Sequence, residues 1–311
     1  MTLLKRKRIL AAKTEATAGT AETLGAGDAA YNVYDLTVQH EIEKTPREGQ
    51  GSFGHLSSTT GGHKGRITFK TDLGWDGTAT EPGWADTFFP ACGWVKVTNT
   101  FTPRSEAPGA NVKTRTMAVY EDGRRKQIRG CMGTFKLVCD TGKQAMIEWD
   151  FTGIWETPTD VTLIAPTYPT VAPLRYASGV TTFNSVALQC QNVTLDSGNT
   201  VYLREGTAAN NISGYLSAVV TNRRPLVTCN PEAKLIGTQD RYLFFRDSTP
   251  YVLTFEIAGP TSSKIVVSAP VATIENIQGA DRESLITDEL TFLCGQNGST
   301  PDQEVSIVFT P

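Results

Sequence analysis

The chain has 311 residues, of which 39% are hydrophobic and 20% charged, so it can bury a core and disorder is not its default state. Its formal net charge of −3 argues against a general nucleic-acid-binding protein, which usually carries a basic excess. The 28 glycines and 16 prolines favour β structure with many turns, and no segment approaches the roughly 18 apolar residues that a membrane-spanning helix needs.

The first predicted element is an extended N-terminal arm, residues 1–30. Its basic cluster, Lys5–Arg8, is followed by only four apolar residues, Ile9-Leu10-Ala11-Ala12. An export signal needs an apolar stretch of roughly 7–15 residues. The arm is therefore not an export signal, and we expect the protein to be made and used in the cytoplasm.

The first predicted domain covers residues 31–157. It begins with a strand at 31–39 and continues with a polar, Gly-rich loop at 43–65, whose length indicates a functional segment. In the next strand, 66–73, the residues that alternate onto one face are apolar or Thr, as expected of a half-buried strand. Residues 81–94 are predicted to form a short helix interrupted by Pro90.

Two turn signals follow in the same domain. Glu121-Asp122-Gly123 and Asp140-Thr141-Gly142 each separate two alternating runs and so predict β-hairpins. Glu148 and Asp150 lie two apart on one of these strands and face the same side. Such a carboxylate pair is compatible with glycoside hydrolysis, but a solvated strand face is the better interpretation.

A Pro-rich stretch, residues 158–184, is predicted to be an extended linker because its four prolines oppose both a helix and a central strand. The second predicted domain, 185–311, starts with strands 185–195 and 200–206 around a hairpin turn. A strand-turn-strand unit at 213–235 and a short helix at 238–249, with Thr238 or Asp240 as N-cap, come next. The order resembles that of the first domain, which indicates a weak internal repeat with a period near 150 residues.

The sequence offers little chemistry. His55 and His63 share one loop with no Cys nearby, which makes a poor metal site, and GQGSFG (49–54) lacks the helix and Lys-Ser/Thr pair of a phosphate loop. The six cysteines are scattered and are predicted to be buried free thiols. We expect no enzyme activity, no catalytic residue, no cofactor and no metal.

Residues 12–20 have the sequence AKTEATAGT. This segment is similar to the AKxExTyGT arm with which the major tail tube proteins of long-tailed, non-contractile bacteriophages often begin, and the chain resembles that family. The resemblance continues in GHKGRITFKTDL, WADTFFPACGW and YEDGRRKQIRGCMGTFKLVCDTGKQAMIEWDFTGIW, and in LDSGNTVYLREG and VVTNRRPLVTCNPEA of the second half. It covers nearly the whole chain through short motifs, and departs from the family pattern at Ala18, where an aromatic residue is usual, and at Pro90.

The resemblance implies a mainly β fold with two tandem tail-tube-like sandwich or barrel modules, each with one short helix. It implies rings, closed by a continuous inner β-barrel, that stack into the tail tube of the virion for genome delivery. Assembly would take place in the host cytoplasm. The implied partners are other copies of the chain and the tail-tip, tape-measure and tail-terminator proteins, while DNA would pass through a net-acidic lumen without specific binding. Three chains in a pseudo-sixfold ring, or six chains with a decorating second domain, both fit.

Within that resemblance, candidate contact residues between copies lie in three places. We expect the basic arm, which has no predicted partner, to act as a strap between rings, and the loop 43–65 to make a second contact between rings. Arg124 and Arg125, which lie at a predicted turn, are expected to form salt bridges, including some across subunits. The candidates are Leu3, Leu4, Lys5, Arg6, Lys7, Arg8, Arg47, Phe53, His55, Arg124 and Arg125.

Two other function classes remain open. A carbohydrate-binding or adhesion module of a virion would need an exposed cluster of aromatic residues, whereas the five tryptophans lie in strand or helix contexts typical of a core. An enzyme would need a catalytic constellation, which the sequence does not show.

Overall fold

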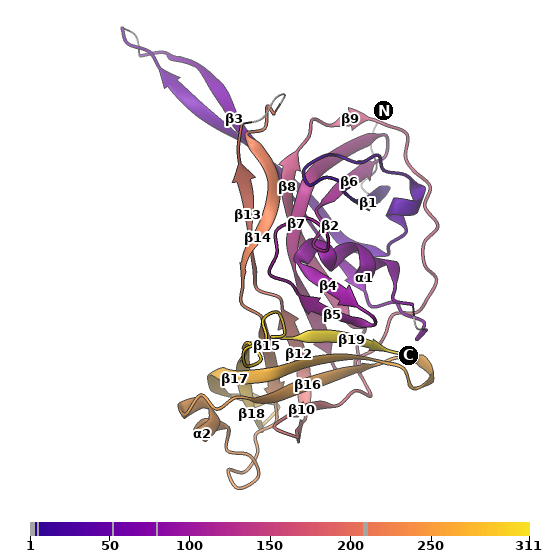
Figure 1. Cartoon of the computed structure of the whole chain (residues 1–311), viewed down its shortest axis with the longest axis vertical. Helices are drawn as coiled ribbons and strands as arrows, with labels where there is room; N and C mark the ends of the chain where they lie inside the picture. Colours follow the sequence, from indigo (N-terminus) through magenta and orange to yellow (C-terminus); the bar gives the residue numbers. More distant parts are fainter. Residues whose placement is uncertain (1–3, 5, 52, 79, 208–210) are drawn as a thin grey trace.

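The computed structural model describes every residue except 1–3, 5, 52, 79 and 208–210 (Figure 1). The fold is mainly β, as the sequence predicts. The strands of the N-terminal half are β1 (Arg8–Thr14), β2 (Val33–Glu48), β3 (His55–Asp72), β4 (Trp94–Val97), β5 (Thr100–Pro103), β6 (Arg115–Glu121), β7 (Arg124–Asp140), β8 (Met146–Trp155) and β9 (Thr159–Asp160).

The C-terminal half is also mainly β. Its strands are β10 (Thr181–Phe183), β11 (Val186–Leu188), β12 (Cys190–Asp196), β13 (Asn199–Glu205), β14 (Tyr215–Arg223), β15 (Leu226–Pro231), β16 (Tyr251–Ala258), β17 (Lys264–Arg282), β18 (Leu285–Cys294) and β19 (Ser306–Thr310). The helices are α1 (Gly83–Phe88) and α2 (Arg241–Arg246), with 3₁₀ turns η1 (Ala26–Ala29), η2 (Pro90–Cys92) and η3 (Pro260–Ser262).

Eight antiparallel strands form the central sheet, in the order β2-β3-β8-β7-β12-β15-β18-β17. One face packs on the core because apolar side chains recur at every second position. In β3 these are Ile67 and Phe69, which are buried, as the predicted alternation requires. The other face carries polar and charged side chains between them.

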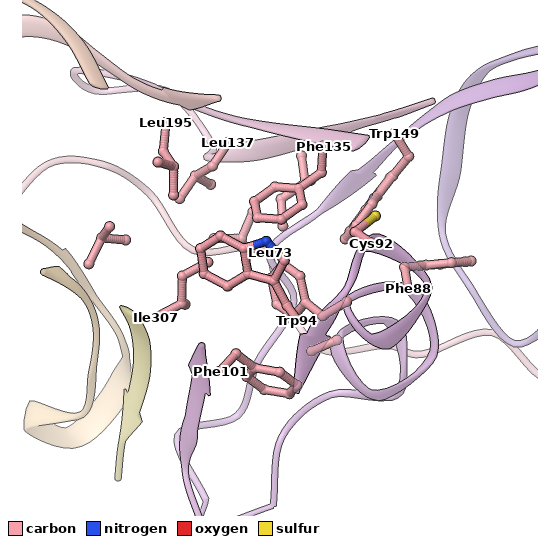
Figure 2. Close-up of a cluster of buried hydrophobic side chains, with 14 of the residues drawn as sticks. Leu73, Phe88, Cys92, Trp94, Phe101, Phe135, Leu137, Trp149, Leu195 and Ile307 are labelled. Carbon is pink, nitrogen blue, oxygen red and sulfur yellow. The ribbon is translucent and has the colours of Figure 1, made fainter. Parts of the chain in front are cut away.

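The two halves of the chain meet inside this sheet. The first half of β7 pairs with β6, and its last residues, Lys136–Asp140, pair instead with Asn192–Asp196 of β12. One apolar cluster runs across the junction, so that Leu195 and Ile307 of the second half lie near Leu137 and Trp94 of the first (Figure 2). The halves therefore share a sheet and a core, and their division at residues 158–184 stays a prediction.

Further strands cover the core face. β1 pairs with β6, β16 pairs with both β10 and β17, and β19 joins β17 to β5. Helix α1 lies against the core and buries Trp84 and Phe88. Arg115 is buried in β6 and donates to the carbonyl of Thr87 at 2.7 Å, which satisfies an otherwise free acceptor at the end of that helix.

The hairpin β13–β14 forms a separate two-stranded sheet that lies along β7 and β8 (Figure 1). It packs through a second, smaller apolar cluster to which Leu203, Tyr215 and Ala218 contribute from the hairpin, and Met132 and Ile154 from β7 and β8. This hairpin belongs to the C-terminal half but covers the N-terminal half.

Three predictions are wrong. Residues 43–65 are not a loop: β2 and β3 continue through them as one long hairpin. The turn at 196–199 does not close a hairpin, since β12 pairs with β7 and β15 while β13 pairs with β14. Residues 8–14 do not form a free arm, because β1 pairs along its whole length with β6 and buries Leu10.

Other predictions are confirmed. Both short helices are present, with Asp240 as the N-cap of α2, whose carboxylate accepts from the Leu243 amide at 2.8 Å. Pro90 starts the 3₁₀ turn that follows α1, a position where its missing N–H costs no hydrogen bond. The turn at Asp122-Gly123 joins β6 to β7 with positive φ at both residues. All six cysteines are free, and all are buried except Cys190, which is half-buried.

Candidate assembly surfaces

The predicted basic residues of the N-terminal segment gather at the β6–β7 turn of their own chain. Glu121 is buried and accepts from Arg8 and Arg124, each at 2.7 Å, and lies 2.9 Å from Lys126. Burial raises the pKa of the Glu121 carboxyl, but hydrogen bonds from Lys126 and Arg124 and the charge of Arg8 lower it overall. This carboxylate therefore holds the start of β1 against the turn.

Two more contacts extend this attachment. The Leu4 amide and the Lys7 ammonium both reach Asp122, at 3.1 and 3.4 Å. Arg6 is exposed, and Leu3 and Lys5 lie outside the described residues. Arg125 pairs through its backbone with Thr159 of β9. The structure thus brings Leu4, Lys7, Arg8 and Arg124 together within one subunit.

The other predicted contact residues lie on the β2–β3 hairpin, which projects from the body at the top of Figure 1. Phe53 is fully exposed near its tip, and Leu56 is about half exposed. His55 lies 3.9 Å from the exposed Glu48, and Arg47 is exposed. An isolated two-stranded ribbon is marginally stable in water, so this hairpin is a surface that a neighbouring molecule would stabilise.

The central sheet ends in two strands whose outer edges pair with no further strand in the described part of the chain, although the Arg8 guanidinium donates to the Leu36 carbonyl of β2 at 3.2 Å. Among the described residues, β2 pairs only with β3, and the last part of β17, Asn276–Arg282, pairs only with β18. Exposed edges of this length invite pairing with another chain. The resemblance implies that edge strands pair between copies, but these two strands were not predicted to be those edges, although the similar strand sequences DLTV (35–38) and NVTL (192–195) were a signal.

Charged side chains of alternating sign cross the polar face of the central sheet. Lys70 lies 3.3 Å from Asp35 and 3.1 Å from Glu148, and the strand register continues this row through Lys136 to Asp196. Beside the row, Asp150 accepts from the Arg66 Nε at 2.7 Å. The carboxylates of Glu148 and Asp150 are therefore engaged by basic partners, as expected of a solvated strand face.

The described part of the chain holds no group of three or more His, Cys, Asp or Glu side chains arranged to bind a metal. All five tryptophans are buried and so offer no stacking platform for a sugar ring. Burial raises the pKa of the Cys92 and Cys131 thiols, which opposes thiolate chemistry at these two positions. No helix of the described residues has the length and apolarity needed to cross a membrane.

A family model for phage tail tube proteins matches residues 5–294, nearly the whole chain. The chain belongs to the phage tail tube protein family. It is thus a structural protein of the virion tail, as the resemblance implies, and its family is one that assembles into a tube. No curated protein matches it.

The arm motif of this tail tube protein, residues 12–20, makes a defined set of contacts within the subunit. Glu15 is buried, and its carboxylate accepts from the Gly19 and Gly130 amides, both at 2.7 Å, and from the hydroxyls of Thr114 and Thr116. Four donors satisfy a buried carboxylate without an ion pair. The motif therefore fixes the turn after β1 to β6 and β7 within the subunit.

Proposed function

We propose that three copies of this tail tube protein close a ring, and that rings stack into the conduit through which the phage genome enters the host. The observation that carries this proposal is the β7–β12 pairing inside one chain, together with the two unpaired edges of the same sheet. Pairing of β2 of one copy with β17 of the next would repeat the internal junction and close the sheet.

The two halves of the sheet use the same pairings, which supports this arrangement. β2 pairs with β3, β3 with β8 and β8 with β7; likewise β12 pairs with β15, β15 with β18 and β18 with β17. A register irregularity falls at matching places, between Tyr34 and Thr37 in β2 and between Cys190 and Val193 in β12. β17 thus corresponds to β7, and β2 corresponds to β12.

The correspondence predicts a register for the contact between copies. Glu148 lies opposite Lys136 and Glu289 lies opposite Gln278, so Gln278 takes the place of Lys136. Gln39 takes the place of Asp196 because each directly follows one of the two similar segments, DLTV (35–38) and NVTL (192–195). The internal pair Asp196–Lys136 then becomes Gln39–Gln278 between copies.

Two further pairs follow from the same register. Thr37 would face Ala280, and Asp35 would face Arg282, which places opposite charges across the contact. Leu285 and Ile286, which are exposed at the β17–β18 turn, would lie against the neighbouring copy. In the first half the matching turn is already covered, with the Gly142 and Thr141 amides donating to the Tyr176 and Gln191 carbonyls.

The number of chains in a ring depends on whether the second half of the chain joins the barrel or decorates its outside. A decorating domain would pack outside the ring and leave the first half to form the barrel alone. Here β12, β15, β18 and β17 extend the same sheet and the same core. Three copies of this eight-strand segment give a barrel roughly 45–50 Å across between backbones, whereas six copies would double that diameter.

Engineered cysteines test the contact. The pair Thr37→Cys and Ala280→Cys is expected to form disulfides between copies, seen as covalent dimers and trimers on a non-reducing gel. The matched control, Thr37→Cys with Asp281→Cys, puts the second thiol on the opposite face of β17 and is expected to remain monomeric. Equal cross-linking of both pairs, or of neither, would contradict the proposed register.

The proposal includes the surroundings of the tube. The polar face of the central sheet would line the lumen, where paired charges let DNA pass without specific binding. Tail-tip, tape-measure and tail-terminator proteins are the proposed further partners, and assembly is proposed to take place in the host cytoplasm. The N-terminal residues and the β2–β3 hairpin remain the proposed contacts between copies.

A further inference from the structure

We infer that the β2–β3 hairpin binds sideways, across β17 and β18 of the neighbouring copy in the same ring. This inference rests on the proposed ring and names the partner surface within it. The surface that binds the hairpin is the region of the second copy around Thr273 and Gly295. The hairpin would therefore strengthen the ring itself rather than reach for the ring above or below.

The hairpin β13–β14 is the internal model for this contact. The chain leaves the central sheet after β12, forms the β13–β14 hairpin and returns to the sheet as β15. In the first half, it leaves the sheet along β2 and returns to it along β3. The segments enclosed by the paired residues Asp196–Leu226 and Gln39–Arg66 are of similar length, residues 197–225 and 40–65. Each therefore occupies the same position in its own half of the repeat.

The internal contact is well built. The Asn199 side-chain amide donates to the carbonyls of Cys92 and Gly133, at 2.8 and 3.0 Å. At Gly130 a Cβ would lie 3.1 Å from the Ser217 Cα, so the two backbones touch. The hairpin buries Ala218 against β7 and β8. A hairpin of the C-terminal half thus binds the N-terminal half without a gap.

At its base the β2–β3 hairpin contacts β13–β14 of its own chain, where the His63 amide donates to the Ser213 carbonyl at 3.1 Å and the Tyr215 hydroxyl to Glu43 at 3.3 Å. Beyond this base it has no such cover in the described part of its own chain. The residues of both arms beyond Ile42 are exposed up to Thr60, apart from Gly49 near the turn and Ser52, which lies outside the described residues. In the described part of the chain neither Lys44 nor Arg47 has an ion-pair partner. If β2 pairs with β17 of the next copy as β12 pairs with β7, the hairpin must run along that copy as β13–β14 runs along its own first half.

The acceptor region follows from the strand register. Met132 of β7 lies opposite Thr152 of β8, and Thr273 of β17 lies opposite Leu293 of β18. Aligning Phe151 with Phe292 makes Leu293 the counterpart of Thr152, so Thr273 corresponds to Met132. Gly295 corresponds in the same way to Ile154, which with Met132 belongs to the apolar cluster beneath β13–β14.

A shortened hairpin distinguishes a sideways contact from contact between rings. Lys44 and Thr60 face each other, so residues 45–59 can be replaced by an Asn-Gly turn without changing the register. Mass photometry, at a concentration where the native protein forms single rings, is expected to show at least a tenfold loss of rings in the variant. Normal rings, whether or not they still stack into tubes, would overturn the inference.

A cross-linking measurement covers the case in which the shortened variant does not fold. Phe53→Cys is labelled with a benzophenone maleimide in single rings, and the cross-linked peptides are identified by mass spectrometry. We expect links to residues 185–311 of a different copy. Links found only in stacked rings, or only to residues 31–157, would overturn the inference.

Two controls complete the design. Ile212→Cys places the same label near the tip of β13–β14, where Ile212 is exposed, and is expected to link within its own chain even in the monomer. The native protein without an added cysteine reports any labelling of the half-buried Cys190. If the native chain forms no rings at all, the proposed function fails, and that outcome is separate from the two above.

Discussion

At the scale of single residues, the arm motif, residues 12–20, makes its contacts within the subunit. Gly19 has φ +81°, and a Cβ at that position would overlap the carbonyl oxygen of Leu216 in β14. Arg129 also donates to the Gly19 carbonyl. This glycine therefore holds together the N-terminal segment, β7 and the hairpin from the second half.

Gly19→Ala is expected to lower the free energy of unfolding by about 3 kcal/mol, because the left-handed backbone and the clash with β14 both oppose a Cβ. Chemical denaturation followed by tryptophan fluorescence measures the change. Gly51→Ala is the control: Gly51 has φ +87° with open space around its Cα, so it tests backbone strain alone, at about 1 kcal/mol. Equal losses in both variants would show that Gly19 does not touch β14.

Glu121 gives a pH-dependent prediction. Its pKa is lowered in the folded state, so its contribution is complete above the unfolded value of about 4.3 and is lost as pH falls through the folded value. Glu121→Gln is expected to cost about 2 kcal/mol at pH 7, with the difference from the native protein shrinking below about pH 4. Denaturation at a series of pH values checks this. The exposed Glu48→Gln serves as control, and a pH-independent loss would contradict the ion-pair explanation.

At the scale of elements, α2 is attached by one buried ion pair. Arg241 donates to Asp288 of β18 at 2.6 Å and to the Glu232 carbonyl at 3.1 Å, and both charged side chains are almost completely buried. Removing one partner leaves the other charge buried and unpaired.

Asp288→Asn is therefore expected to destabilise the protein by about 3 kcal/mol. Hydrogen exchange is expected to show faster exchange in residues 232–246, with little change in β7 and β8. Asp247→Asn, which removes an exposed partner of Arg246, is expected to leave exchange unchanged. Uniform acceleration over the whole chain would mean that the pair supports the entire fold rather than the attachment of α2.

The elements also show what the sequence could predict. Alternation identified β3, because Ile67 and Phe69 face a core on one side only. It failed for residues 43–65, because almost all side chains of residues 43–60 are exposed on both faces of the hairpin and no apolar period marks the strands. It failed at 196–199 for a different reason: a turn signal gives the local bend, but the partners of β12 and β13 are set by long-range packing. The sequence predicted the contact residues of the candidate surfaces only in part. It could not identify the edge strands, because the local sequence of an edge strand does not distinguish it from other strands.

At the scale of the whole molecule, the polar face is expected to keep DNA weakly bound. Its carboxylates offset Arg66, Lys70 and Lys136. The double variant Glu148→Gln with Asp150→Asn frees these basic groups, and assembled tubes are expected to bind duplex DNA at least tenfold more tightly at about 50 mM salt, with the difference fading as salt rises. Fluorescence anisotropy measures both. Unchanged affinity would mean that this face does not line the lumen.

The most direct test of the central claim is electron microscopy of the purified protein at rising concentration, with class averages of end-on views. The shared sheet of the two halves predicts closed rings of three chains with pseudo-sixfold symmetry, which stack into hollow tubes. Rings of six chains, or only small monodisperse particles even when tail-tip complexes are added, would contradict it.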